Sequence, residues 1–121
     1  MNNMTMMEES ARRFSDAENM WLWFMQCVRH KTDRGRFMIM GKRIAEPMDI
    51  ENLITRLYLS GKISRDQIEV LHEFGIRGRA PRQHVYSENK KVPKWQDAIR
   101  VITIAASAKG WLEGSAKGYT G

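Results

Sequence analysis

The sequence has one cysteine (Cys27), three prolines and no long apolar stretch among its 121 residues. A single cysteine excludes an internal disulfide and a cysteine-rich zinc site, and this scarcity fits the reducing cytoplasm. A membrane-spanning helix needs about 18 consecutive apolar residues, and even the apolar run Val101–Ala106 is interrupted by Thr103. The N-terminus MNNMTMMEES lacks the cationic start and apolar centre of a secretory signal. We therefore predict a cytoplasmic protein that does not contact membranes.

Residues that commonly catalyse reactions or bind metals are also sparse. His30, His72 and His84 lie in three separate segments, without the i, i+4 spacing of a zinc-binding helix. Cys27 falls one position off the apolar face of its predicted helix, and we interpret it as a packing residue. No phosphate-binding loop, dinucleotide fingerprint or nucleophile elbow is present. The sequence therefore predicts a protein that is not an enzyme, with no catalytic residue, metal or cofactor.

The composition is that of one globular domain, because 42% of the residues are apolar and 28% are charged. We predict a flexible leader over residues 1–10, a helical domain over residues 11–112 and a flexible tail over residues 113–121. The leader contains Met1, Met4, Met6 and Met7. A disordered leader is one interpretation of these methionines, and an adaptable contact with a partner or second subunit is the other.

A first helix is predicted from the apolar spacing between Phe14 and Val28. Two pairs with capping-box spacing mark alternative starts: Thr5 with Glu8, and Ser15 with Glu18. Its bulky aromatic residues are interpreted as core, because base-stacking platforms usually lie on sheets or in open grooves. Trp23 lies off the main apolar face and is a candidate contact for a second subunit.

Two further helices are predicted on either side of a glycine turn. The first begins near Pro47 and ends at Ser60–Gly61. The second begins with the capping-box pair Ser64 and Gln67 and ends at Gly75. This spacing is similar to that of a helix-turn-helix, and it also fits a plain helical hairpin.

The second of these helices exposes mostly acidic side chains: Asp66, Glu69 and Glu73. Such a face would be repelled by phosphate, so a structural hairpin and a base-reading helix both stay open. Arg65, beside the helix start, is the residue expected to contribute most if DNA approaches there.

The last helix is predicted from Pro93 to Lys109–Gly110, with Trp111 and Leu112 as a closing contact. Two short runs, Phe37–Met40 and Gln83–Ser87, have strand character and could pair as a small ribbon. The predicted fold is therefore mainly α: a small single-domain bundle of about four helices with a helix-turn-helix-like hairpin and a two-stranded ribbon.

Positive charge is unevenly distributed along the chain, which has 20 basic and 14 acidic residues and a net charge of +6. Residues 29–45 carry six basic residues against one acidic residue, and residues 77–100 carry seven against two. An acidic segment separates these two basic blocks. Blocks of this kind are typical of polyanion binding, since each cation placed near a phosphate releases a counterion. Solvated loops that keep the protein soluble are the alternative.

The run Arg77-Gly78-Arg79-Ala80-Pro81-Arg82 resembles the Arg-Gly-Arg-Pro core of the AT-hook, with Ala80 inserted before the proline. The resemblance implies an extended segment that inserts arginines into the narrow minor groove of A·T-rich DNA. A flexible surface loop from Ile76 to Lys94 without core contacts is the alternative.

We therefore predict a nucleic-acid-binding protein, with double-stranded DNA favoured over RNA, that acts as a small transcription regulator or architectural factor. A non-enzymatic helical adaptor for an acidic protein partner is the alternative, and a homodimer fits either function. The predicted binding residues are the cations of the two blocks and the hairpin: Arg34, Arg36, Lys42, Arg43, Arg65, Arg77, Arg79, Arg82, Lys90, Lys91 and Lys94.

Overall fold

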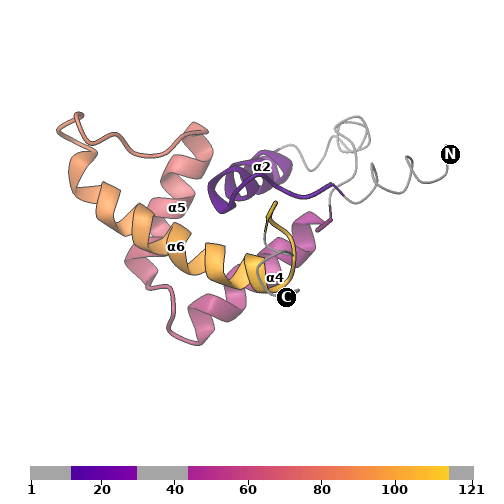
Figure 1. Cartoon of the computed structure of the whole chain (residues 1–121). Coiled ribbons are helices and arrows are strands. Elements are labelled where there is room, and N and C mark those ends of the chain that lie inside the picture. Colours follow the sequence, from indigo (N-terminus) through magenta and orange to yellow (C-terminus); the bar gives the residue numbers. More distant parts are fainter. Residues whose placement is uncertain (1–11, 30–43, 115–121) are drawn as a thin grey trace, which may run out of the picture.

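The computed structural model describes residues 12–29 and 44–114, which contain four α-helices and one short 3-10 helix. These elements are α2 (Ala17–Arg29), α4 (Pro47–Leu59), α5 (Arg65–Arg77), η1 (Asn89–Lys91) and α6 (Val92–Ala108). The longest helix, α6, crosses the molecule, with α5 and α2 packed against it and α4 packed against α2 (Figure 1). The prediction of a mainly helical, single-domain bundle is confirmed.

The start of α2 differs from the predicted capping boxes. Asp16 precedes the helix, and its carboxylate accepts a hydrogen bond from the Asn19 N–H at 2.7 Å, as an N-cap aspartate does. Ser15 lies one residue too early for this role and accepts a hydrogen bond from the Asn19 side-chain amide instead. The alternative start at Thr5 lies outside the described residues.

The predicted boundaries of α4 and the predicted start of α5 are confirmed. Pro47 is the first residue of α4, and Ser60 follows its last residue. At the start of α5, the Gln67 N–H donates to Ser64 Oγ at 3.1 Å, and the Ser64 N–H donates to Gln67 Oε1 at 2.8 Å. Gly61 in the turn has a φ of 82°, a left-handed conformation that favours glycine.

The predicted end of α5 at Gly75 is wrong, because the helix continues to Arg77 and ends at the left-handed Gly78. Gly75 is buried on the side of α5 that packs against α2. A Cβ atom added there would lie 2.5 Å from Met25 Cγ. Glycine therefore serves close packing of two helices at this position, and it is not a helix terminator.

The predicted two-stranded ribbon is absent from the described residues. Residues 83–87 form turns, and the predicted pairing partner, residues 37–40, lies outside the described part of the chain. The alternation along residues 83–87 arises because Val85 is partly buried while His84 and Tyr86 are exposed. A single partly buried residue in a turn produces the same short pattern as a strand.

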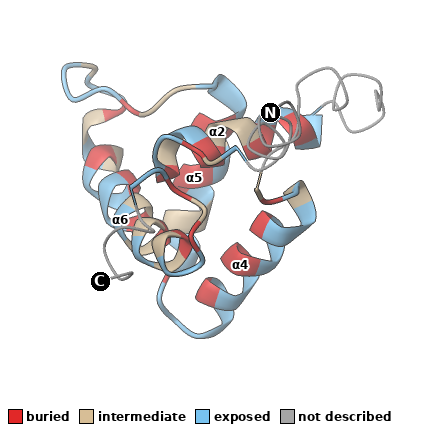
Figure 2. Cartoon of the chain, turned by 45° about the vertical axis from the view of Figure 1, so that its right-hand side comes forward, coloured by how far each residue is buried: buried red, intermediate tan, exposed pale blue. Residues whose placement is uncertain are grey.

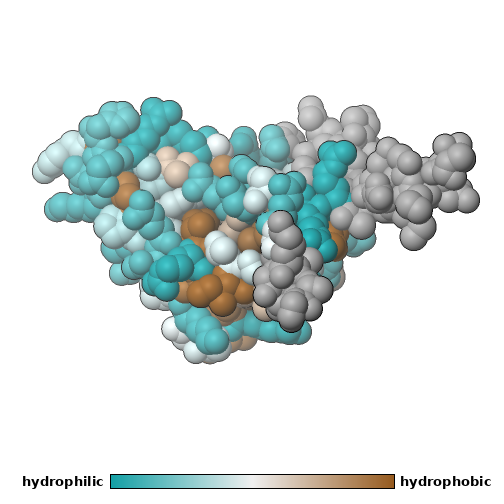
Figure 3. Space-filling view, viewed as in Figure 1, coloured by the Kyte–Doolittle hydropathy of each residue, from teal (hydrophilic) through white to brown (hydrophobic). Residues whose placement is uncertain are grey.

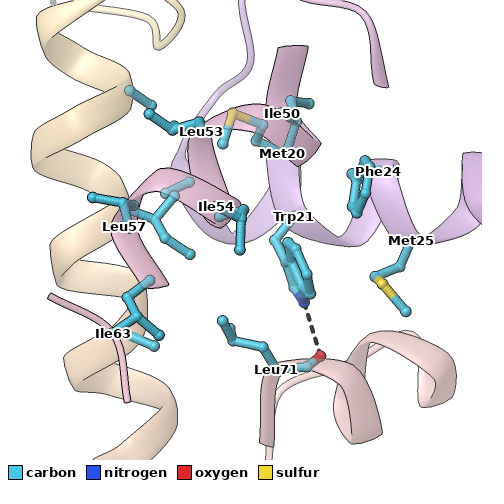
Figure 4. Close-up of a cluster of buried hydrophobic side chains, with 14 of the residues drawn as sticks. Met20, Trp21, Phe24, Met25, Ile50, Leu53, Ile54, Leu57, Ile63 and Leu71 are labelled. Atoms are coloured by element: carbon cyan, nitrogen blue, oxygen red, sulfur yellow. Dashed lines mark hydrogen bonds between the residues drawn. The ribbon is translucent and has the colours of Figure 1, made fainter. Parts of the chain in front are cut away.

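The aromatic face of α2 lies in the core, as predicted, and buried residues line the inward faces of the helices (Figure 2). Trp21 is buried between helices, and its Nε1 donates to the Leu71 carbonyl of α5 at 2.9 Å (Figure 4). The centroids of the Trp23 and Phe14 rings lie 5.2 Å apart. Trp23 is partly buried and packs against the hydrophobic core. The side chain considered as a subunit contact therefore has a packing role within this chain.

The segment after α6 returns to the beginning of the described chain. The Phe14 N–H donates to the Trp111 carbonyl at 2.9 Å, and the Glu113 N–H donates to the Phe14 carbonyl at 2.8 Å. Leu112 is buried in the same region. The predicted closing contact is confirmed, whereas the predicted leader over residues 1–10 lies outside the described residues.

Candidate nucleic-acid interface

The structure separates the predicted binding residues into three groups. Four of them lie outside the described residues: Arg34, Arg36, Lys42 and Arg43. Arg65 lies apart from the rest, at the start of α5. Six lie where residues 78–91, here called the connecting segment, join α5 to α6 (upper left in Figure 1): Arg77, Arg79, Arg82, Lys90, Lys91 and Lys94.

Glu88 is the buried centre of this end of the molecule and is only 4% exposed. Arg79 donates to both of its carboxylate oxygens, from Nη1 at 2.9 Å and from Nη2 at 2.7 Å. Arg77 Nη1 donates at 3.0 Å, and the backbone N–H of Arg82 donates at 2.9 Å. Charge-assisted, bidentate bonds of this kind are among the stronger hydrogen bonds in proteins. Glu88 therefore ties the connecting segment to the end of α5.

These contacts lower the pKa of Glu88 from an ordinary value of 4.5 to about 2. The hydrogen bonds from Arg79 are the largest cause, and the Arg82 N–H and the charges of Arg79 and Arg77 act in the same direction, while burial opposes them. The hydrogen bond to Glu88 also raises the pKa of Arg79. Glu88 is therefore ionised at neutral pH, as the pairing requires.

A second carboxylate and a buried ring complete the cluster. Glu73 on α5 accepts hydrogen bonds from Arg77 Nη2 at 3.1 Å and from Lys91 Nζ at 2.9 Å. Three cationic groups lie near the centroid of the buried Phe74 ring: Arg77 at 4.9 Å, Arg79 at 5.8 Å and Lys91 at 5.9 Å. These distances suit cation–π attraction. We call Arg77, Arg79 and Lys91 the inner cations, because their contacts hold the connecting segment against α5.

The expectation that this region makes no core contacts is wrong. Pro81 is buried, and Ala80 packs against the hydrophobic core. The segment is held by ion pairs and a few apolar contacts, and neither kind of contact leaves a periodic pattern in the sequence. The sequence does contain one usable signal, since Glu88 is the single acidic residue between Arg82 and Lys90 in a strongly basic stretch.

The conformation at Arg77–Arg79 differs from the extended path that the AT-hook resemblance implies. Arg77 is the last residue of α5, and Gly78 reverses the chain in a left-handed conformation. Both arginines are directed to the same carboxylate, that of Glu88. Their side chains stay partly exposed, at 44% and 31%, so they still contribute positive potential to the surface.

Three further cations lie on the outside of this end: Arg82, Lys90 and Lys94. We call them the outer cations. Neither Arg82 nor Lys90 forms a side-chain ion pair with any residue that the structure describes. Lys94 Nζ lies 4.0 Å from Asp66 Oδ2, an exposed contact that contributes little. In Figure 3, most of the side chains at this end of the molecule are hydrophilic.

The α4–α5 hairpin is less suited to a phosphate backbone. Arg65 Nε lies 3.7 Å from Glu69 Oε2, and the next residue in the chain, Asp66, is also exposed. α4 packs on α2, whereas α5 packs on α2 and α6, so both helices rest on a third helix. Because the two acidic groups offset the charge of Arg65, this face has little attraction for phosphate.

Residues 12–29 and 44–114 contain no cluster of three or more side chains that could hold a metal ion, and Cys27 within them is buried. None of the helices described is long and apolar enough to cross a membrane. The chain matches no protein-family model, no curated protein and no solved structure.

Proposed function

We propose that the protein binds nucleic acid, with double-stranded DNA as the preferred form, through the end of the molecule that carries the outer cations. The observation that supports this proposal is the division between two sets of cations. The inner cations pair with Glu73 and Glu88 and hold the connecting segment, while the outer cations stay exposed on that segment and on the first turn of α6. A positively charged array on a held segment loses less conformational entropy on binding than one on a free loop.

The number of outer cations sets the expected strength of binding. Each cation that neutralises a phosphate of duplex DNA releases about 0.9 of a counterion, so three contacts give a slope of log K against log salt near −3. Non-specific affinity is then micromolar or weaker near physiological salt. A small protein that binds in this way would act as a regulator or an architectural factor.

The proposal is tested by fluorescence anisotropy with a labelled duplex of about 20 base pairs, titrated between about 50 and 200 mM salt. We expect the combined substitution Arg82→Ala, Lys90→Ala and Lys94→Ala to reduce the salt slope by nearly three units. Its melting temperature should be close to that of the parent, because the three side chains are exposed.

The matched control removes three exposed cations elsewhere: Arg56→Ala, Lys62→Ala and Lys109→Ala. These residues lie on α4, in the α4–α5 turn and at the end of α6. Duplex binding by the control should stay near that of the parent. Equal losses in both triple variants would indicate a diffuse basic surface, and no duplex binding at the lowest salt would reject the proposal.

An adaptor for an acidic protein partner is a second candidate function, favoured by a groove of about 560 Å³ between α4 and α5. Ile54, Tyr58 and Ile68 supply its apolar lining, and the paired side chains of Arg65 and Glu69 lie at the same groove. The apolar lining suits the apolar face of an amphipathic helix, whereas an acidic edge on that helix would have to meet cations outside the groove. Such a partner should stay bound at high salt and after nuclease treatment, and Ile68→Glu should release it. A nucleic-acid ligand should instead be lost under both treatments and be insensitive to Ile68→Glu.

A further inference from the structure

The connecting segment presents an aromatic side chain to solvent. Tyr86 is 87% exposed, more than any other exposed large hydrophobic residue in the described part of the chain. Arg82, His84 and Lys90 are exposed on the same segment. An aromatic ring in this position buries almost no surface within the chain, so folding does not account for it.

The backbone around Tyr86 is held by hydrogen bonds. The Val85 N–H donates to the Arg82 carbonyl at 3.2 Å, and the Val85 carbonyl accepts from the N–H groups of Glu88 and Asn89, both at 2.9 Å. The carboxylate of Glu88 in turn accepts from the Arg82 N–H at 2.9 Å. The ring is thus carried on a closed set of turns, and a tyrosine side chain has only two torsions to order when it binds.

The cations near Tyr86 in the chain indicate what kind of ligand could stack on its ring. Arg82 and Lys90 lie a few residues to either side of Tyr86, and both are exposed. A polyanion with accessible π faces satisfies both features at once, and single-stranded nucleic acid is such a ligand. A duplex contributes phosphates, but its bases are stacked on one another and their faces are covered.

We infer that Tyr86 stacks on an unpaired base of single-stranded nucleic acid while Arg82 and Lys90 contact the phosphates next to it. This inference rests on the proposed function and adds to it a contact with unpaired bases, which a fully paired duplex does not offer. Stacking on an aromatic side chain tolerates any base, so no strong sequence preference is expected from Tyr86.

The test measures anisotropy of a labelled thymidine oligonucleotide, an abasic oligonucleotide of the same length and a duplex. Tyr86→Ala should weaken binding of the thymidine strand roughly 5- to 160-fold, the range for loss of one base–aromatic stack. Its salt slope should be unchanged, because no phosphate contact is removed. Tyr86→Phe keeps the ring and should bind like the parent.

The abasic strand keeps the phosphates and lacks the bases, so Tyr86→Ala should leave its binding unaltered. The double variant Arg82→Ala and Lys90→Ala should reduce the salt slope on every single strand by about 1.4 units, at about 0.7 for each contact. Because Tyr86 is exposed, its substitution should leave the melting temperature unchanged. A loss of binding by the variant would then not be caused by unfolding.

The outcomes separate the inference from the proposed function. If the parent protein binds the strands and Tyr86→Ala binds the thymidine strand equally well, the stacking inference is rejected and the proposed function stands. If Tyr86→Ala weakens the abasic strand as much as the thymidine strand, the ring does not act by stacking and the inference is likewise rejected. If the parent binds no oligonucleotide at low salt, the proposed function itself fails.

Discussion

The two connections of α5 are built by different physical means. The turn between α4 and α5, residues 60–64, is short and depends on its own residues: Gly61 takes the left-handed conformation, Ile63 is 1% exposed, and Ser64 caps the next helix. The connecting segment, residues 78–91, is longer and is held mainly by the carboxylates of Glu88 and Glu73. A short turn can be specified by local backbone preferences, whereas a long connection needs partners that meet only in the folded state.

The largest expected effect comes from Trp21→Ala. This substitution removes a large buried ring that packs against α5, the helix that both connections join. Trp21 fills the space between α2 and α5 and donates to the Leu71 carbonyl. Loss of the ring should lower the free energy of unfolding by about 3 to 5 kcal/mol, as measured by urea denaturation. The exposed residue Gln26 on the same helix provides the control, since Gln26→Ala should change stability by less than about 0.5 kcal/mol. A small effect of Trp21→Ala would mean that α5 is positioned by other contacts.

A smaller loss is expected for Ile63→Ala, which tests the short turn alone. Its side chain is buried in the core, and its deletion should destabilise the protein by about 2 to 5 kcal/mol, less than Trp21→Ala because fewer buried atoms are removed. The neighbouring Lys62 is exposed, so Lys62→Ala should be close to neutral. Similar melting temperatures for the two variants would show that Ile63 does not anchor the turn.

Next in size is Glu88→Gln, which tests the connecting segment. Without the carboxylate charge, Arg79 and Arg77 lose their common partner, so the melting temperature should fall by less than it does for Ile63→Ala. Limited proteolysis should then cut within residues 78–91 and leave the α4–α5 turn intact. Glu69→Gln is the matched control, because the exposed pair of Glu69 with Arg65 contributes little.

The same comparison has a pH dependence. The pKa of Glu88 in the folded protein is about 2, below its ordinary value of 4.5. Ionised Glu88 therefore contributes its full stabilisation of the fold at any pH above about 4.5. As the pH falls from about 4.5 to about 2, this stabilisation is lost. The difference in melting temperature between the parent and Glu88→Gln should therefore be constant near neutral pH and should shrink across this acidic interval. A difference that persists at pH 2 would show that the effect does not come from the charge of Glu88.

The smallest expected effect is that of Ser64→Ala, which removes the cap of α5. Loss of an N-cap hydroxyl should destabilise the protein by about 1 kcal/mol. Ser64→Asp keeps an acceptor for the Gln67 N–H and should stay near the stability of the parent. If alanine and aspartate at this position give equal stability, the cap does not help to define the turn.

Much of the fold is predictable from the sequence, because helix boundaries depend on side chains close to them in the chain. Pro47 and the pair Ser64 and Gln67 mark helix starts that the structure confirms. Asp16 and Gly75 show the limit of this approach. Several polar residues near a helix start compete to cap it, and a glycine serves equally well to end a helix or to admit a neighbouring one.

The sequence by itself therefore determines the helical class, the boundaries around the short turn and the excess of positive charge near residues 77–100. Only the tertiary structure decides which of those charges remain exposed. Arg79 and Arg82 have the same side chain and lie three residues apart, yet Arg79 is paired with a buried carboxylate while the guanidinium of Arg82 stays in solvent. The reason is that Coulomb attraction depends on distance in space, and folding brings Glu73 and Glu88 to the same end of α5.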